Sequence, residues 1–395
     1  MRLLIVGEGS VSEEVRSFQA YKYFSELDTF KGEKLETILQ VLPHLGGDVE
    51  IHSDIDVVIL SRPMWPPLIK VYQDNGAVVI ADQDDDFMAI PNTHVAYKSI
   101  GPGNPKRTQD HQISLTMVDQ LIVSTPILAE RFATRKLQSP ENITIIPNAW
   151  ANRNPLWDGS SLKSSRIVIG WGGTITHRED FKIAIPALEA VVWPKYDVDI
   201  RIVGDPKIYQ MLRNVAEYGK LFIPMVEYKV YPLVLTMCDI WLAPLVDDHF
   251  NRSKSDIKLV EAGAAGIPWI ASPVPQYEAW KHGGIFADSH DAWHAALLAL
   301  IESPELRASL GASGRTHAEA RKFDNVFPLW EHVVEKAYEL KQNADTLLLR
   351  RQQNRMELFG MADESSNAGN KPDGRTPSQD DVHRRSGRGH KRKRK

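Results

Sequence analysis

The sequence predicts an α/β protein with two doubly wound, Rossmann-like domains that face a cleft, followed by a disordered basic C-terminal tail. Apolar runs alternate with helical patterns in both halves, as in parallel sheets that are covered on both faces. A stretch rich in Asn, Ser, Gly and Pro interrupts this alternation at residues 148–165, and apolar residues become scarce after about residue 352. We therefore expect an N-terminal domain at 1–150, a linker at 151–165, a C-terminal domain at 166–345 and a disordered tail at 352–395.

The individual elements follow from short apolar runs and from helical spacing. In the N-terminal half these patterns predict strands at 2–6, 56–60, 77–81, 120–124 and 142–146, and helices at 11–27, 106–118 and 126–136. In the C-terminal half they predict strands at 166–171, 198–203, 239–242 and 268–271, and helices at 180–192, 206–218, 231–237, 254–265, 291–302, 304–321 and 325–342. Doubly wound sheets bind ligands at the carboxyl ends of their strands, so we expect the site in the cleft between the domains.

Composition excludes several classes of protein. Of 395 residues, 43% are hydrophobic and 25% are charged, which is ordinary for a globular chain with two cores. The single cysteine, Cys238, excludes a disulfide framework and a thiolate zinc site. No apolar run approaches the roughly 20 residues that span a bilayer, and the first run is too short for a secretory signal. We therefore expect a cytoplasmic protein without a membrane span.

Charge is unevenly distributed along the chain. Residues 341–395 contain 14 Lys and Arg against 7 Asp and Glu, so this part is basic although the whole chain has a formal charge of -4. The chain ends in Lys-Arg-Lys-Arg-Lys. Such a block is either a solvated appendage or an electrostatic arm for nucleic acid.

Residues 251–272 contain a pattern that suits a nucleotide. Ser253 is a plausible N-cap, and Lys254, Lys258 and Glu261 are spaced to share one face of the helix that follows. Lysines in the first turns of a helix suit a diphosphate, and a carboxylate one turn later could accept hydrogen bonds from ribose hydroxyls. The alternative is a solvated face with ordinary Lys–Glu pairing.

A glycine-rich stretch, residues 169–180, also follows a predicted strand. Gly172 and Gly173 permit close approach of a ligand to the backbone, and His177 and Arg178 precede a helix where an anion could bind. The alternative is an ordinary strand–helix connection. The Gly-Glu-Gly-Ser loop at 7–10 lacks the full dinucleotide spacing, which argues against a bound NAD.

Carboxylates cluster at Asp82-Gln-Asp-Asp-Asp86. They could hold a divalent metal, or they could pair with Arg and Lys and anchor a loop. His94 is a candidate group on the acceptor side, although a single histidine is more often a structural hydrogen-bonding residue.

These motifs together resemble the retaining glycosyltransferases of the GT-B fold, close to the family 4 type. The resemblance is greatest to the phage and bacterial branch with Asp-Asp-Asp and Lys-Ser-Asp-Ile-Lys signatures. The matching stretches are 82–91, 123–148, 170–180 and 243–272.

The family pattern is Glu, seven residues, Glu. Glu261 matches the second Glu, which in the family binds ribose. Ser253 occupies the first position, and Asp247, Asp248 and Asp256 are candidates to replace the missing carboxylate. The family's diphosphate-binding Arg and Lys fall near Gly172 and His177.

The resemblance implies transfer of a sugar from a nucleotide-sugar to an unidentified acceptor, without a metal and without a cofactor beyond this co-substrate. The expected catalytic residues are His94 and Asp86. The expected donor-binding residues are Gly172, Gly173, His177, Arg178, Lys254, Lys258 and Glu261.

Two alternatives remain open. The basic tail is consistent with a phage glycosyltransferase that acts on modified DNA bases in the host cytoplasm. The missing first Glu is consistent with a GT-B-fold binding protein that has no transfer activity.

Overall fold

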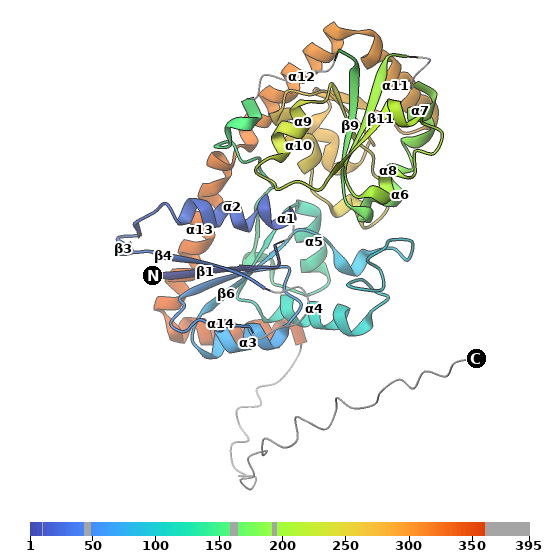
Figure 1. Cartoon of the computed structure of the whole chain (residues 1–395). Helices are drawn as coiled ribbons and strands as arrows, with labels where there is room; N and C mark the ends of the chain where they lie inside the picture. Colours follow the sequence, from blue (N-terminus) through green and yellow to red (C-terminus); the bar gives the residue numbers. More distant parts are fainter. Residues whose placement is uncertain (10, 43–48, 159–164, 192–195, 360–395) are drawn as a thin grey trace, which may run out of the picture.

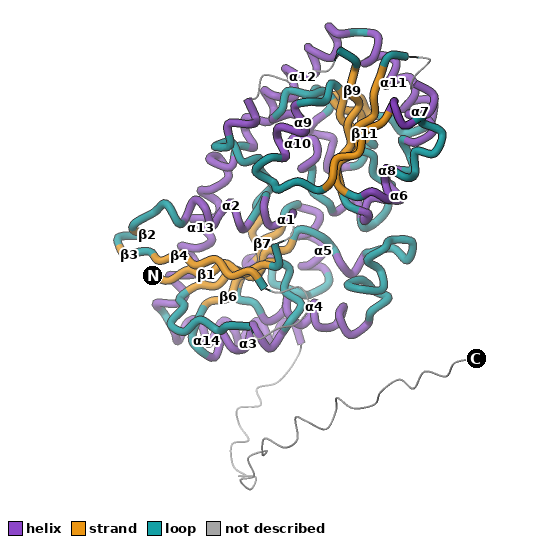
Figure 2. The backbone as a smooth tube through the Cα atoms, in the orientation of Figure 1, coloured by secondary structure: helices purple, strands orange, loops and turns teal. Residues whose placement is uncertain are grey.

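The computed structural model describes residues 1–9, 11–42, 49–158, 165–191 and 196–359. It confirms the predicted fold class, because the chain forms two α/β domains that each contain a six-stranded parallel sheet with helices on both faces (Figure 1). The two sheets lie in separate halves of the molecule (Figure 2), and the long helix α13 lies beside the N-terminal sheet (Figure 1).

The N-terminal sheet has the strand order β4-β1-β5-β6-β7-β8. Side chains of β1 alternate between its two faces: Leu3 and Ile5 pack in one core, whereas Leu4 and Val6 pack in the other. Both faces are therefore buried, which explains the continuous apolar runs. The strands are β1 Arg2–Gly7, β4 Glu36–Val41, β5 Val57–Ser61, β6 Val78–Gln83, β7 Gln120–Val123 and β8 Ile143–Ile145, and β2 Thr29–Phe30 pairs with β3 Glu33–Lys34 in a separate hairpin. The helices are α1 Val11–Glu14, α2 Ser17–Phe24, α3 Pro66–Asp74, α4 Pro105–Met117 and α5 Pro126–Thr134.

The C-terminal sheet has the order β11-β10-β9-β12-β13-β14, so the strand order reverses between β9 and β12. This reversal marks the point where doubly wound sheets bind ligands. The strands are β9 Ile167–Gly173, β10 Val198–Gly204, β11 Lys220–Pro224, β12 Ile240–Ala243, β13 Trp269–Ala271 and β14 Gly284–Phe286. The helices are α6 Arg178–Phe181, α7 Ile185–Val191, α8 Pro206–Tyr209, α9 Tyr231–Thr236, α10 Ile257–Ala264, α11 His290–Glu302 and α12 Pro304–Ala318.

The helix predicted at 325–342 belongs to the N-terminal domain and not to the C-terminal domain. This helix, α13 Phe323–Gln342, and the helix α14 Ala344–Phe359 that follows it return to the N-terminal domain (Figure 1). Trp330 and Val334 of α13 pack in the same core as residues of β1 and β5. The N-terminal core therefore includes residues from 323 onward, and the predicted domain boundary at 345 is wrong. Sequence pattern shows that a helix is amphipathic but does not show which sheet covers its apolar face.

The predicted linker and tail also contain ordered elements. Trp157 is buried in the core of the C-terminal domain, and residues 159–164 lie outside the described part of the chain. The tail that we expected from residue 352 begins inside α14, which extends to Phe359. Buried Leu347 and the ion pair of Arg351 with Asp119, at 2.6 Å, hold this helix on the domain. The remainder of that tail, residues 360–395, is outside the described residues.

The sequence patterns missed three edge strands, β4, β11 and β14, whose half-exposed side chains give only short apolar runs. They also missed the β2–β3 hairpin and the helices α3 and α14. The helix predicted at 11–27 is divided into α1 and α2, and the one predicted at 206–218 ends at Tyr209. Within the described ranges, no helix combines the length and the apolar character that crossing a bilayer requires.

Candidate active site between the two domains

Loops from both domains enclose a cavity of about 160 Å³. The N-terminal domain contributes Pro91, Thr93 and His94, which follow β6. The C-terminal domain contributes two groups of residues that follow β9 and β12, where the strand order reverses. These groups are Thr176, Glu179 and Asp180, and Val246, Asp248, Phe250 and Asn251. The cavity therefore lies where we expected the site.

Two expected donor-binding residues meet at the end of β9. Lys258, the second residue of α10, donates a hydrogen bond through Nζ to the carbonyl oxygen of Gly172 at 2.5 Å. Its ammonium also lies 5.2 Å from the centre of the Trp171 ring. Burial lowers the pKa of Lys258 to about 8, although Glu261 and Asp180 oppose this shift.

Glu261 lies one turn further along α10, on the same face as Lys258, and its side chain is buried. Burial raises the pKa of Glu261 to about 8, whereas Lys258 and the hydroxyls of Tyr228 and Tyr231 favour its charged form. The two tyrosine rings are stacked, with centroids 6.3 Å apart. Glu261 is therefore a buried acceptor beside a cation at the ligand-binding end of the sheet.

The structure places Lys254 differently from the sequence prediction. α10 begins at Ile257, so Ser253 is not its N-cap and Lys254 does not share the helical face of Lys258 and Glu261. Lys254 extends to the other domain instead, where its Nζ lies 3.0 Å from Asp85. Ser253 is fully buried, and its hydroxyl donates to the carbonyl of Phe250, which keeps this segment in a 3-10 turn ahead of the helix.

The three proposed replacements for the missing carboxylate have different surroundings. Asp247 pairs with Arg252 at the exposed surface. Asp256 pairs with Arg321 at 2.8 Å and accepts from the indole of Trp280. Asp248 alone of these three lines the cavity, where its Oδ1 accepts from the backbone N–H of Asn251.

His177 forms part of a hydrogen-bonded group centred on Asp180. The Asp180 carboxylate contacts His177 Nδ1 at 2.9 Å and accepts from the side chain of Asn251 at 2.7 Å and from the backbone of Val246. Burial, with Lys258 and Lys254 nearby, lowers the pKa of His177 to about 4. His177 is therefore neutral at pH 7. Arg178 is exposed and lies 3.8 Å from Glu179, and it is not among the described residues that line the cavity.

The glycines at the end of β9 have a packing role. A Cβ added to Gly172 would lie 3.1 Å from Trp241, and one added to Gly173 would lie 2.9 Å from Trp171. These contacts alone account for glycine at both positions.

The four carboxylates at 82–86 are all paired with cations. Arg16 contacts Asp82 at 2.6 Å, Arg62 contacts Asp84 at 2.6 Å, and Lys254 contacts Asp85. Asp86 is fully buried and accepts from Arg131 and Arg135. The sequence left open whether these carboxylates bind a divalent metal or pair with Arg and Lys, and the structure supports pairing with basic side chains.

The pairing of Asp86 with two arginines separates the two expected catalytic residues, His94 and Asp86. The cavity lining includes His94 but not Asp86, whose oxygens face two arginines. Asp86 thus positions α5 and the loop after β6, and the structure does not bring it together with His94 at the cavity. The burial of Asp86 beside two guanidinium groups therefore indicates that it anchors these segments, whereas we expected a catalytic role from the sequence.

Sequence reasoning did not identify Asp180, Asn251 or Phe250 as cavity residues. Asp180 belongs to the glycine-rich stretch, but the sequence pattern identified it only as the first residue of a predicted helix. The ring of Phe250 lies 5.3 Å from that of His94 and joins the two domains. Only the folding of separate loops towards one another reveals these three residues.

Part of the chain is similar to known proteins. Residues 166–303 match the family described as Glycosyl transferases group 1. A curated relative is the GDP-mannose-dependent monoacylated alpha-(1-6)-phosphatidylinositol monomannoside mannosyltransferase of Corynebacterium glutamicum, which is 27% identical over 162 residues. This match covers 39% of the chain and 42% of the relative, so the chain spans less than half of that protein.

Solved structures show the same architecture over most of the chain. Sucrose-phosphate synthase from Thermosynechococcus elongatus has a TM-score of 0.63 at 12% identity, over 86% of this chain and 99% of its own. HepE from Anabaena, solved in complex with UDP-glucose, has a TM-score of 0.59 at 14% identity, over 86% of this chain and 100% of its own. The chain therefore has the GT-B fold, and its second domain matches the glycosyl transferases group 1 family.

Proposed function

We propose that this chain is a retaining glycosyltransferase that moves a sugar from a nucleotide-sugar to an acceptor. The observation that carries the proposal is the Lys258–Glu261 pair on α10, beside the end of β9, where the strand order of the second domain reverses. The match of the same domain to the glycosyl transferases group 1 family supports it.

The nucleotide would bind at α10. The Glu261 carboxylate is a buried acceptor suited to the two hydroxyls of a ribose, and Lys258 supplies a cation for the diphosphate one turn earlier. The positive end of the α10 dipole favours the same anion. Ribose hydroxyls that donate to Glu261 would favour its ionised form and so offset the effect of burial on its pKa.

The transferred sugar would lie in the cavity, where His94 acts as a hydrogen-bond donor. His94 Nδ1 accepts from the backbone N–H of Ala96 at 3.1 Å, so the neutral ring carries its proton on Nε2. Burial and the nearby Lys254 lower the pKa of His94 and favour this neutral form. His94 Nε2 can donate to a sugar hydroxyl, and the Asp248 carboxylate can accept from one.

In the proposed reaction the bond between the sugar and the diphosphate breaks, and the acceptor oxygen forms the new bond. The acceptor proton leaves with the diphosphate. Lys258 and the α10 N-terminus offset the charge that develops on the leaving group, and the cavity holds the sugar in place. The barrier is therefore lowered by positioning and electrostatics.

GDP-mannose and UDP-glucose are the first donors to test, because the curated relative is named GDP-mannose-dependent and the Anabaena structure contains UDP-glucose. Each donor would be titrated in a thermal-shift assay, and release of the nucleoside diphosphate would be followed with and without simple sugar acceptors. The same assays on Lys258→Gln test the donor site, with Arg213→Gln as a control at an exposed arginine of the same domain.

We expect a donor to raise the melting temperature of the parent protein and of Arg213→Gln, and to have a much smaller effect on Lys258→Gln. A donor that binds but is never transferred or hydrolysed would favour the alternative of a binding protein. Equal responses of the two variants would show that the donor does not bind at α10. DNA as the acceptor is a separate prediction, since the basic residues 384–395 lie outside the described part of the chain.

A further inference from the structure

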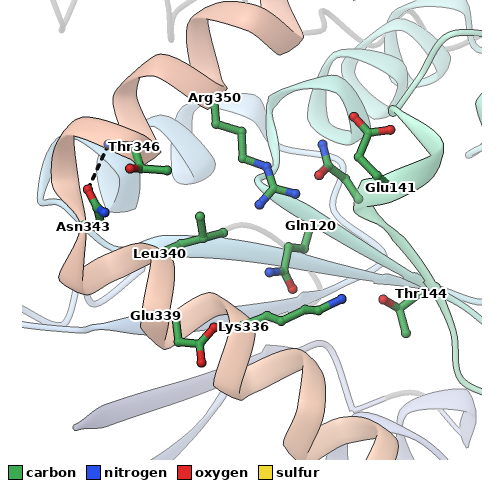
Figure 3. Close-up of a pocket in the computed structure, with 10 residues that line it drawn as sticks. Gln120, Glu141, Thr144, Lys336, Glu339, Leu340, Asn343, Thr346 and Arg350 are labelled. Carbon is green, nitrogen blue, oxygen red and sulfur yellow. Dashed lines mark hydrogen bonds between the residues drawn. The ribbon is translucent and has the colours of Figure 1, made fainter.

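A second cavity, of about 280 Å³, lies in the N-terminal domain between its sheet and the α13–α14 pair (Figure 3). Gln120, the first residue of β7, lines it, so the cavity is at the amino end of that strand. The candidate active site lies at the carboxyl ends of the strands. The two cavities are therefore at opposite ends of the domain.

The amide of a largely buried residue, Gln120, faces this cavity without a protein partner among the described residues. Gln120 is only 5% exposed, and its side chain makes no hydrogen bond to any residue that the structure describes. Figure 3 shows the amide pointing into the hollow between Lys336 and Arg350. Because no described side chain or backbone group occupies this amide, it is available to bind a ligand or water in the cavity.

Two cations approach the same space from different helices. Lys336 on α13 and Arg350 on α14 line the cavity, and across the described ranges neither forms an ion pair or a side-chain hydrogen bond. Buried Leu347 and the Arg351–Asp119 ion pair hold α14 on the domain, and so fix the backbone position of Arg350 beside the cavity. Two cations without an ion-pair partner can bind an anion between them, and the carboxylates Glu141 and Glu339 of the same lining limit the negative charge that the cavity can accept.

We propose that this cavity is a binding site for a small phosphate monoester that also carries hydroxyl groups. The Arg350 guanidinium and the Lys336 ammonium would bind the phosphate, because a planar fork and a point charge both suit phosphate oxygens. Gln120 and the Thr144 hydroxyl would bind the polar body of the ligand. The exposed carboxylates Glu141 and Glu339 can accept from ligand hydroxyls and disfavour an extended polyanion such as nucleic acid.

The same chemistry occurs in a soluble metabolite and in a lipid headgroup, so the test has two arms. In the first arm the full chain is titrated by calorimetry with glycerol 3-phosphate, inorganic phosphate and uncharged glycerol. In the second arm it is floated with phosphatidylcholine vesicles, with and without phosphatidic acid. Both arms use Arg350→Gln and Lys336→Gln, with Arg107→Gln as the control at an exposed arginine of the same domain. Lys258→Gln is tested as well, because a loss of binding in this variant would show that the probe binds at the proposed donor site and not in this cavity.

We expect glycerol 3-phosphate to bind with a stoichiometry of one and more tightly than inorganic phosphate, and glycerol not to bind. Arg350→Gln and Lys336→Gln should each weaken binding about tenfold or more, whereas Arg107→Gln and Lys258→Gln should leave it unchanged. Binding that depends on Arg350 but occurs only on vesicles with phosphatidic acid would also support the site and would assign it to a lipid.

Three results would overturn the proposal: no binding in either arm, binding that survives Arg350→Gln, or binding that is lost in Lys258→Gln instead. Melting temperatures of the variants distinguish lost binding from lost folding. Because Lys336 and Arg350 have no partner among the described residues, neither variant should lower the melting temperature in the absence of ligand.

Discussion

The Lys258 ammonium donates to the carbonyl oxygen of Gly172 at 2.5 Å, which joins the first turn of α10 to the end of β9. A cation is thereby held at the carboxyl end of the sheet, one turn before a buried carboxylate, Glu261. The pair lies where the strand order reverses, so local hydrogen bonding and sheet topology place a basic and an acidic side chain at the end of the sheet where doubly wound domains bind ligands.

Replacement of Glu261 tests the ribose assignment. Glu261→Ala should weaken donor binding by roughly 1.5–3 kcal/mol, the range for hydrogen bonds to a charged group. Calorimetric titration with GDP-mannose or UDP-glucose, whichever binds the parent protein, provides the measurement, and Glu278→Ala provides a control at an exposed carboxylate of the same domain. If folded Glu261→Ala binds the donor as tightly as the parent protein, Glu261 does not hold the ribose.

The Arg16–Asp82 pair should be important for stability. Both side chains are buried, and Arg16 also donates to Ile146 and Asn148. Asp82→Ala should lower the free energy of unfolding by roughly 3–5 kcal/mol, because it leaves a buried guanidinium without its counter-ion. Denaturant titration measures the loss. The exposed Lys70–Asp74 pair is the matched control, and Asp74→Ala should cost less than about 1 kcal/mol. Equal losses in the two variants would contradict this role.

Chelation tests the interpretation of residues 82–86. Each carboxylate there already has a basic partner, so we expect sugar transfer to continue in EDTA. The measurement is the rate of nucleotide release before and after chelation. Activity that disappears in EDTA and returns with magnesium or manganese would show that a metal participates.

His111 should make the protein less stable in mild acid. Burial lowers its pKa to about 4, and its Nδ1 lies 2.9 Å from the carbonyl oxygen of Pro63. The unfolded chain protonates this histidine near pH 6.5, whereas the folded protein resists protonation until about pH 4. The free energy of unfolding should therefore fall as the pH decreases from 6.5 to 4, by up to roughly 3 kcal/mol for this group.

Denaturant titrations across that pH range measure the slope. His111→Gln removes the titrating group, so its slope should be smaller than that of the parent protein even if the variant is less stable throughout. His177, whose pKa is also lowered to about 4, would keep part of the slope. An unchanged slope in His111→Gln would contradict the assignment.

Truncation separates α14 from the basic residues that follow it. A chain that ends at Phe359 should keep its melting temperature, because α14 and its Arg351–Asp119 ion pair remain. A chain that ends at Lys341 should melt at a lower temperature, since it loses buried Leu347 and Arg351. Removal of residues 360–395 should also reduce any affinity for DNA, most strongly at low salt. If both truncated chains melt like the full chain, α14 does not stabilise the domain.

The sequence by itself determined the fold class and much of the element order. Central strands such as β5 and β9 were predictable, because a strand that is buried on both faces needs a continuous apolar run. Edge strands such as β4 and β14 were not, because half-exposed positions accept polar residues. Local pattern also identified Lys258 and Glu261, whose spacing along one helix places them together without any long-range contact.

Only the tertiary structure decided what depends on distant partners. It placed α13 and α14 on the N-terminal sheet, which an apolar stripe alone could not specify. It directed Lys254 to Asp85 in the other domain, a contact across 169 positions of the chain that helical spacing could not predict. It paired Asp86 with two arginines in ion pairs, and it brought His94 and Asp180 to one cavity. The physical reason is that charge pairing and burial depend on which loops meet in space, whereas propensity and periodicity depend only on neighbours along the chain.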